Sequence, residues 1–96
     1  MRTIKYTLQF EKDWRRETKG RSAEAIAKLK VDLTAVTKLL QDDAVLPRQY
    51  KDHPLSGKWK HHRDCHVRND LVLIYSKPDQ DTLALARLGS HSELFR

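Results

Sequence analysis

The sequence predicts an α+β fold of two layers, in which two helices pack on one face of a mainly antiparallel sheet. Two observations lead to this prediction: a helical stripe of apolar residues in the first half of the chain, and three apolar stretches separated by short turns in the second half. The expected order is a strand, two helices, a long loop and three strands. Ninety-six residues suit a single domain, 1–96, that buries one modest core.

The chain is expected to open with a strand over residues 4–10 and a short helix over residues 11–19. The apolar residues that alternate with polar ones are Ile4, Tyr6, Leu8 and Phe10. A period of two is typical of a strand with one buried face. The next stretch is polar apart from Trp14, which lies four residues after Phe10 and can pack beside it on a helix that ends at Gly20.

A second helix is predicted to begin after Ser22, which can cap it, and to end near Asp42 and Asp43. The apolar residues at alternating spacings of three and four are Ile26, Leu29, Leu33, Val36 and Leu40. This spacing puts them all on one helix face. We therefore expect the stripe to form core rather than a ligand site.

Three antiparallel strands are expected after a long loop, residues 44–57, that contains two prolines and a glycine. The predicted strands are residues 59–67, 71–75 and 82–88, with turns at 68–70 and 77–81. Turns of this length join antiparallel strands, and a central strand is apolar on both faces, as residues 71–75 are. The helices would cover one face of the sheet. The opposite face, flanked by the loop and the C-terminal tail, is left for function.

The composition describes a folded basic domain. The net charge is +6 and the isoelectric point is near 9.7, while 39% of the residues are apolar. Nucleic acid is the commonest polyanion that such a surface meets, although an acidic protein partner would produce the same charge balance. The lone Cys65 cannot form an internal disulfide, and no apolar run approaches the roughly 20 residues that span a bilayer. We expect a cytoplasmic protein that does not bind membranes.

Histidines are concentrated in one part of the chain. Four of the five lie between His53 and His66, and the fifth is His91. Such clustering is typical of proton transfer or metal binding. Between Arg48 and Arg68 the basic residues outnumber the acidic ones six to two, which suits a polyanion and favours proton transfer. A basic groove lined with histidines is what a metal-free ribonuclease needs, so we expect no metal and no cofactor.

Several residues of this stretch leave other interpretations open. His62 and His66 have a spacing that would suit zinc on a helix, but on a strand these side chains diverge. Neighbours on a strand point to opposite faces, so at most one of His61 and His62 can face a substrate. Trp59 could stack on a base or fill the core beneath the sheet. Cys65 is expected to be a small buried side chain rather than a nucleophile.

Three motifs make the second half recognisable. They are Y-K-D-H-P-L-S-G-K-W-K at residues 50–60, R-D-C-H-V at residues 63–67 followed by Asp70, and R-L-G-S-H-S-E-L-F at residues 87–95. Together they resemble the YafQ branch of the RelE-like toxins, the toxin halves of bacterial type II toxin-antitoxin pairs. The resemblance implies the RelE-like microbial ribonuclease fold and an endoribonuclease that cuts mRNA on the translating ribosome. It also implies a cognate antitoxin, with operator DNA bound only indirectly through that antitoxin.

The resemblance carries over a set of site residues. They are His53, His66, Asp70, Arg87, His91 and Phe95. We expect His91 to be the general acid and either His53 or His66 to be the base. Arg87 would stabilise charge on the phosphate, Asp70 would orient a histidine, and Phe95 would stack on a base. The basic residues Lys58, Lys60 and Arg63 are expected to bind substrate. Leu71 stands where some relatives carry Trp, which removes one ring for stacking.

Two other classes of function remain. A ParE-like inhibitor of a protein target such as a topoisomerase would share the fold but would have no use for the histidines and the aspartate. A plain RNA-binding module would use the basic groove without cutting.

Overall fold

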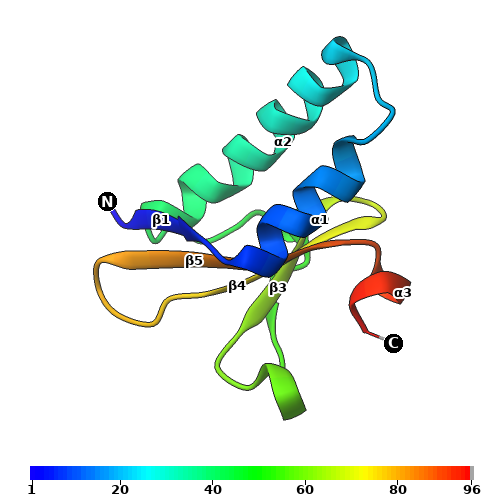
Figure 1. Ribbon diagram of the computed structural model, residues 1–96. Coiled ribbons are helices and arrows are strands. Elements are labelled where there is room, and N and C mark those ends of the chain that lie inside the picture. The colour runs from blue at the N-terminus through cyan, green and yellow to red at the C-terminus, as the bar shows by residue number, and fades with distance from the viewer. Residues whose placement is uncertain (96) are drawn as a thin grey trace.

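A computed structural model describes residues 1–95 as a five-stranded sheet with two helices on one face (Figure 1). The strands are β1 (Thr3–Tyr6), β2 (His53–Pro54), β3 (Arg63–Arg68), β4 (Leu71–Ser76) and β5 (Thr82–Gly89). The helices are α1 (Leu8–Thr18), α2 (Ala23–Gln41) and α3 (His91–Leu94), with 3₁₀ turns η1 (Arg48–Tyr50) and η2 (Gly57–Trp59). The strand order is β1-β5-β4-β3-β2, in which only the β1–β5 pair is parallel. The predicted two-layer α+β architecture is confirmed.

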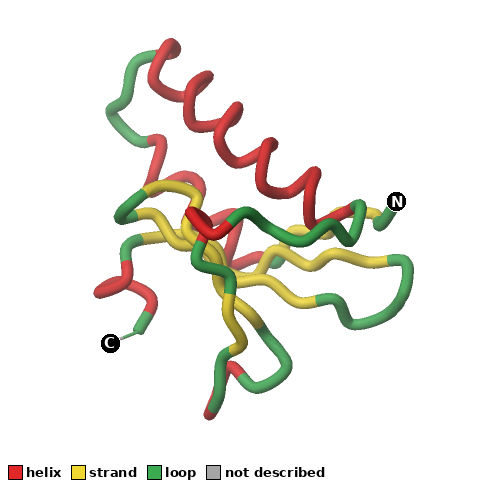
Figure 2. The backbone as a smooth tube through the Cα atoms, turned by 180° about the vertical axis from the view of Figure 1, so that it is seen from behind, coloured by secondary structure: helices red, strands yellow, loops and turns green. Residues whose placement is uncertain are grey.

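The apolar stripe of α2 packs on the sheet as predicted. Leu29, Leu33, Val36 and Leu40 are all buried in the main core. From β4 the side chains of Leu73 and Tyr75 enter the same cluster. Figure 2 shows from behind that both long helices lie on one side of the strands. None of the helices within residues 1–95 is long and apolar enough to cross a membrane.

The first strand is shorter than the alternation predicts. β1 ends at Tyr6, and Leu8 and Phe10 belong to α1, so the prediction of a strand through Phe10 is wrong. The reason is Thr7, whose hydroxyl accepts a hydrogen bond from the Phe10 amide at 3.0 Å and caps the helix. Helical geometry buries Phe10 in the main core and leaves Leu8 exposed.

The strand predicted over residues 59–67 also begins later than expected. β3 starts at Arg63 instead of residue 59, because η2 includes Trp59 and His61 adopts a left-handed backbone with φ of 71°. The strand geometry that would separate His61 from His62 is therefore absent at these positions. At the other end of the chain, the expected tail forms α3, which has a capping box between Ser90 and Glu93.

Side chains of α1 and its cap cover the part of β5 that extends beyond β1. β1 stops pairing at Leu85, and past that point the Thr7 hydroxyl donates to the Ala86 carbonyl at 2.8 Å. Further along, Arg16 donates to the Leu88 carbonyl at 2.7 Å, and Asp13 accepts from the Leu88 amide at 2.9 Å. These three backbone groups, which a neighbouring strand could otherwise satisfy, thus have side-chain partners. This arrangement fixes α1 against the end of β5, where α3 begins.

Candidate active site

The sheet register brings three of the predicted site residues, His53, His66 and Arg87, onto one face. Residues paired directly across strands share a face, and two rows of paired residues cross the sheet. The first row is His53, Asp64, Ile74 and Arg87, and the second is His66, Val72 and Gly89. Val72 and Ile74 belong to a cluster separate from the core beneath α1 and α2. Both rows therefore lie on the face that the long helices leave open.

A small apolar cluster forms the floor of this face. Its buried members are Val72, Ile74, Ala86 and Leu94, and the partly buried Leu55, Trp59 and Phe95 pack against it. The register shift between Ile74 and Tyr75 inserts Ala86 as an extra residue of β5 beside Arg87, which is the effect of a β-bulge. Trp59 thus packs against the floor of the open face and not into the core beneath α1 and α2.

Asp64 is a buried carboxylate at the centre of the site. Its side chain is 1% exposed, and neither carboxylate oxygen accepts a hydrogen bond from residues 1–95. Its Oδ1 lies 3.0 Å from His53 Nδ1, but that nitrogen points at the Lys51 carbonyl 2.9 Å away. Burial raises the pKa of the Asp64 carboxyl, while positive charge on nearby histidines lowers it. These histidines are His53, His66 and His91.

The three histidines come from three different elements. His53 lies on β2, His66 lies on β3 with its Nδ1 3.3 Å from the Asn69 carbonyl, and His91 is the first residue of α3. The His91 and Phe95 rings face each other with centroids 4.6 Å apart. The remaining pair is placed differently: His62 packs edge-on against Trp59, and His61 is exposed. The structure therefore gathers the histidines that the motifs single out and leaves the other two outside.

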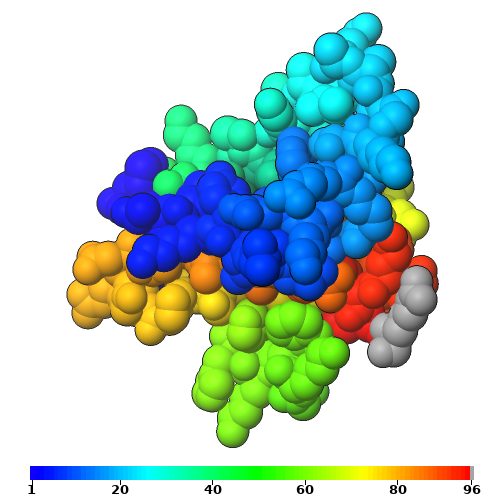
Figure 3. Space-filling model, in the orientation of Figure 1, coloured from blue at the N-terminus to red at the C-terminus, as the bar shows by residue number. Residues whose placement is uncertain are grey.

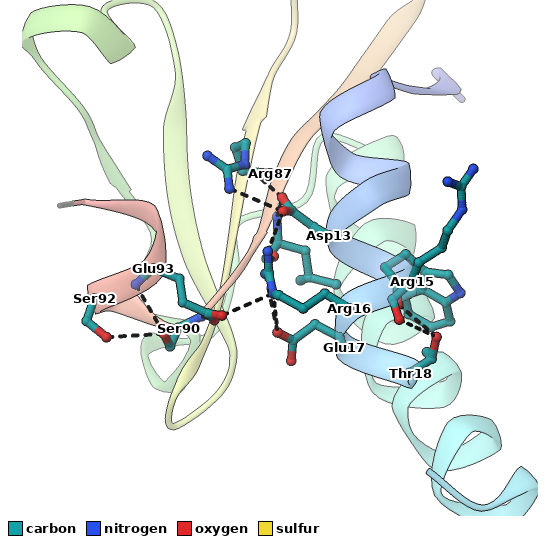
Figure 4. Close-up of polar contacts among 11 residues, drawn as sticks. Asp13, Arg15, Arg16, Glu17, Thr18, Arg87, Ser90, Ser92 and Glu93 are labelled. Carbon is teal, nitrogen blue, oxygen red and sulfur yellow. Dashed lines mark hydrogen bonds and ion pairs between the residues drawn. The ribbon is translucent and has the colours of Figure 1, made fainter. Parts of the chain in front are cut away.

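Arg87 is held by a buried aspartate of α1 (Figure 4). Its Nε and Nη2 donate to the two carboxylate oxygens of Asp13 at 2.8 and 3.1 Å. Burial alone would raise the pKa of Asp13, but hydrogen bonds from Arg87, the Leu88 amide and Arg16 outweigh it and lower that pKa. Asp13 thus remains charged and fixes the Arg87 guanidinium at the end of the first row.

The loop before β2 is pinned by Asp52, the neighbour of His53. Arg63 donates to both oxygens of Asp52, at 3.3 and 3.2 Å, and the Tyr75 hydroxyl donates to Oδ1. Arg63 pairs with Tyr75 in the register, and Tyr75 lies in the core beneath the helices. The Arg63 side chain therefore leaves β3 on the face that the helices cover. The structure therefore separates Arg63 from the other predicted substrate-binding residues and gives it a tethering contact.

Three other predicted residues, Asp70, Lys58 and Lys60, lie further from Asp64 and the three histidines. Asp70 is exposed in the β3–β4 turn beside Arg21 and Arg68, and no hydrogen bond or ion pair joins it to a histidine within residues 1–95. Lys58 and Lys60 are exposed on the connection between β2 and β3, where the Lys58 ammonium lies 5.8 Å from the centre of the Trp59 ring. Leu71 is buried in the main core.

Two residues of the site escape sequence reasoning. Asp64 has a signal that could have found it, because it lies two residues before His66 on a strand and must share its face. Asp13 has no such signal in the sequence, because its contact Arg87 lies 74 residues further along the chain and comes close only in the folded protein. Cys65 is buried as predicted, and burial raises the pKa of its thiol. Within residues 1–95 no group of three or more His, Cys, Asp or Glu side chains has the geometry to hold a metal ion.

The fold and the histidine-lined face define the class: a bacterial toxin of a type II toxin-antitoxin system. Within this class the chain belongs to the YafQ family, because the family model described as "Bacterial toxin of type II toxin-antitoxin system, YafQ" matches residues 2–96. The mRNA interferase toxin YafQ of Escherichia coli K12 is 40% identical over 94 residues, covering 98% of this chain and 96% of that protein. The resemblance inferred from the motifs is confirmed.

Solved structures agree with this assignment and confirm the RelE-like fold. The E. coli DinJ-YafQ complex contains a chain with a TM-score of 0.78 and 37% identity, matched over 100% of both chains. A copper-bound mutant toxin from Helicobacter pylori has a TM-score of 0.83 and 38% identity over 99% of this chain and 100% of that one. The bound copper belongs to that Helicobacter protein.

Proposed function

We propose that this chain is an mRNA interferase, an endoribonuclease that cuts mRNA bound to the ribosome and so stops translation. The observation that carries the proposal is the convergence of His53, His66 and His91 around buried Asp64. Arg87 lies in the same row of the sheet. No single local segment contains these groups. The register puts His53, Asp64, His66 and Arg87 on one open face, and α3 contributes His91.

The proposed chemistry needs a base, an acid and a fixed positive charge. A base takes the proton of the ribose 2′-hydroxyl, and that oxygen attacks the adjacent phosphorus. The bond to the 5′-oxygen breaks, and an acid protonates the departing oxygen, leaving a cyclic phosphate and a 5′-hydroxyl. We assign the acid to His91 and the base to His53 or His66, each expected to contribute on the order of 10²- to 10⁴-fold.

Asp64 would orient a histidine of the site. Its carboxylate is buried, and its Oδ1 lies 3.0 Å from His53 Nδ1. The sequence analysis gave this orienting role to Asp70. Asp70 remains a candidate for contact with RNA at the β3–β4 turn.

Arg87 and the aromatic ring of Phe95 would hold the substrate. Asp13 occupies the Nε and Nη2 side of the Arg87 guanidinium, so donors on Nη1 remain for the phosphate oxygens whose charge grows during cleavage. Phe95, one helical turn from His91, would stack on a neighbouring base. Lys58 and Lys60 would contact the RNA backbone from the exposed connection beside the site.

We also propose the partners that this activity requires. The cognate antitoxin would be acidic and partly disordered, wrapping the basic face as it folds. Operator DNA would be bound only through that antitoxin. The ribosome and its mRNA would be met in the cytoplasm.

The test is to incubate the purified protein with ribosomes translating a defined mRNA and to map the new 5′ ends. We expect cuts that carry 5′-hydroxyl groups and that require the ribosome. His91→Gln should lower the single-turnover rate by roughly 10²-fold or more. His61→Gln is the matched control and should cut normally, because that exposed ring lies outside the site.

Other outcomes would contradict the proposal. Ribosome binding without new 5′ ends would indicate an RNA-binding module. Growth arrest in cells with intact mRNA would point to a protein target, as for the ParE-like inhibitors. Equal cutting by wild type and His91→Gln would remove His91 as the acid.

A further inference from the structure

A cluster of charged side chains joins α1 to the two elements that carry the site residues Arg87 and His91. Its members are Asp13, Arg16 and Glu17 of α1, Arg87 of β5 and Glu93 of α3 (Figure 4). Surface ion pairs contribute little, but this cluster is anchored by Asp13, whose side chain is fully buried. The cluster lies outside the chemistry proposed above, except for Arg87.

Asp13 satisfies its carboxylate completely at the end of β5. Oδ1 accepts from Arg16 and Arg87, and Oδ2 accepts from Arg87 and from the Leu88 amide, at distances between 2.8 and 3.1 Å. A two-point contact with a carboxylate sets both the position and the plane of a guanidinium. Arg87 is therefore held in one orientation before any substrate arrives.

Arg16 carries the contact from α1 to α3. Its Nη1 donates to Asp13 at 2.8 Å, and its Nη2 donates to the Leu88 carbonyl at 2.7 Å. Its Nε lies 3.0 Å from Glu93 Oε2. The other oxygen of Glu93 accepts from the Ser90 amide at 2.9 Å, within the capping box that starts α3. One guanidinium thus contacts the end of β5 and the helix that carries His91.

Gly89 shows how closely these groups approach. A Cβ atom at this position would lie 2.6 Å from Arg16 Nη2 and 3.2 Å from both Glu93 Oε1 and Leu94 Cδ2. A side chain at this position would therefore displace the Arg16 guanidinium from its place against the turn between β5 and α3. The close fit of Arg16 against this turn explains the glycine on packing grounds.

We propose that Asp13 and Arg16 of α1 are positioning residues for RNA cleavage: Asp13 orients Arg87 toward the scissile phosphate, and Arg16 fixes α3 so that His91 meets the departing oxygen. The inference rests on the proposed function and adds to it a group of residues that never touch RNA. Small displacements of catalytic groups are costly, since a shift of about 1 Å can lower a rate by roughly 10²-fold.

Two substitutions loosen this contact and leave the fold in place. Arg16→Gln removes the bridge but keeps the bonds from Asp13 to Arg87 and Leu88. Glu93→Gln removes the charge that Arg16 meets but keeps the capping box, because Gln serves as well as Glu there. Lys28→Gln is the control, because it breaks the exposed Lys28–Glu24 pair on α2 with the same loss of charge as Arg16→Gln.

The measurement is single-turnover cleavage of ribosome-bound mRNA over a range of ribosome concentrations. We expect Arg16→Gln and Glu93→Gln each to lower the maximal rate by roughly tenfold, with the half-saturating ribosome concentration unchanged. The double variant should be no slower than the slower single variant, because the two substitutions remove the same contact between Arg16 and Glu93. A purely structural role would instead lower the folded fraction and leave the rate per folded molecule intact.

A spectroscopic readout tests the Asp13 contact independently of cleavage. The Nε–H of Arg87 donates to a buried carboxylate, so its NMR signal should resist exchange with water in wild type and in Arg16→Gln. Asp13→Asn should lose that protection. An exchange rate for the Arg87 Nε–H as fast as that of an exposed arginine in wild type would overturn the proposal.

The cleavage results separate this inference from the proposed function. If wild type cuts mRNA and both Gln variants match Lys28→Gln, the inference fails and the function stands. If wild type cuts nothing, the proposed function fails and the inference falls with it, whatever the NMR signal shows.

Discussion

Two buried carboxylates, Asp13 of α1 and Asp64 of β3, behave in opposite ways. Asp13 and Asp64 are both excluded from water, with side chains 0% and 1% exposed. Asp13 receives N–H donors at both oxygens, and its pKa is lowered; Asp64 receives none within residues 1–95, and its pKa is raised. Burial sets the direction of the Asp64 pKa shift, whereas hydrogen bonds outweigh burial at Asp13. The number of donors therefore separates the two carboxylates.

Replacing Asp64 by Asn tests its cost to the fold. The pKa of the Asp64 carboxyl in the folded state lies above the ordinary value of 3.8. Its contribution to stability is therefore fully present below pH 3.8 and is lost as the pH rises through the folded-state pKa. At pH 7 the free energy of unfolding of Asp64→Asn should therefore exceed that of wild type by on the order of 1 kcal/mol, and the variant should unfold at a higher temperature. The difference should shrink toward pH 4, where the wild-type carboxyl takes up its proton.

Thermal unfolding followed by circular dichroism at both pH values checks this prediction. Asp13→Asn is the control of opposite sign, because a lowered pKa means stability that is present above 3.8 and lost as pH falls. It should destabilise the protein by roughly 3 kcal/mol at pH 7, as breaking a buried pair does. An Asp64→Asn variant that is less stable at both pH values would show that the histidine charges fully compensate the carboxylate.

Among the elements, the short helix α3 depends most on its cap. With four residues it has no internal stability, and its first turn is held by Ser90 Oγ, which accepts from the Glu93 amide at 3.2 Å. The same helix carries His91 and ends at Phe95, so the geometry of the site depends on this capping box as well as on the contact between Arg16 and Glu93.

Ser90→Ala should therefore lower both stability and cleavage. Loss of a serine cap costs about 1 kcal/mol. Ser22→Ala provides the comparison, because Ser22 caps α2 in the same way, accepting from the Ala25 amide at 3.1 Å, at an end of α2 that holds no site residue. We expect similar losses in unfolding temperature for both variants but a several-fold slower single-turnover rate only for Ser90→Ala. Equal cleavage rates for Ser90→Ala and Ser22→Ala would mean that cleavage does not depend on the cap of α3.

The elements also show what a sequence can predict. The α2 stripe was predictable because a helical period repeated over several turns has few alternative explanations, and β4 because it is apolar throughout. β1 was overextended because the alternation continues across Thr7, whose capping role competes with it. α3 is too short for any periodic signal. The motif histidines were found through resemblance, whereas Asp13 could be found only in three dimensions, since no local pattern marks its contact with Arg87.

At the scale of the whole molecule, the two faces of the sheet have different roles. The core beneath α1 and α2 stabilises the fold, and the open face presents the charged groups. Figure 3 shows the β2–β3 connection and α3 projecting on the side away from α2. Because the molecule is only 36 × 30 × 27 Å, a ribosome or an antitoxin that covers the open face would reach both projections at once. Recognition by this face should then depend strongly on charge.

Lys58 and Lys60 are suited to test that dependence, because both are exposed on the β2–β3 connection. Binding of RNA by cations releases counterions, and each lost phosphate contact should reduce the slope of log affinity against log salt by about 0.7 to 0.9. Changing both lysines to Ala should thus reduce the slope for ribosome binding by about 1.5 and leave cleavage at low salt in place. Changing Lys28 and Lys38 of α2 to Ala removes the same charge from the opposite side and should leave the slope as in wild type. Equal slopes in the two double variants would mean that net charge, and not a footprint on the β2–β3 connection, governs binding.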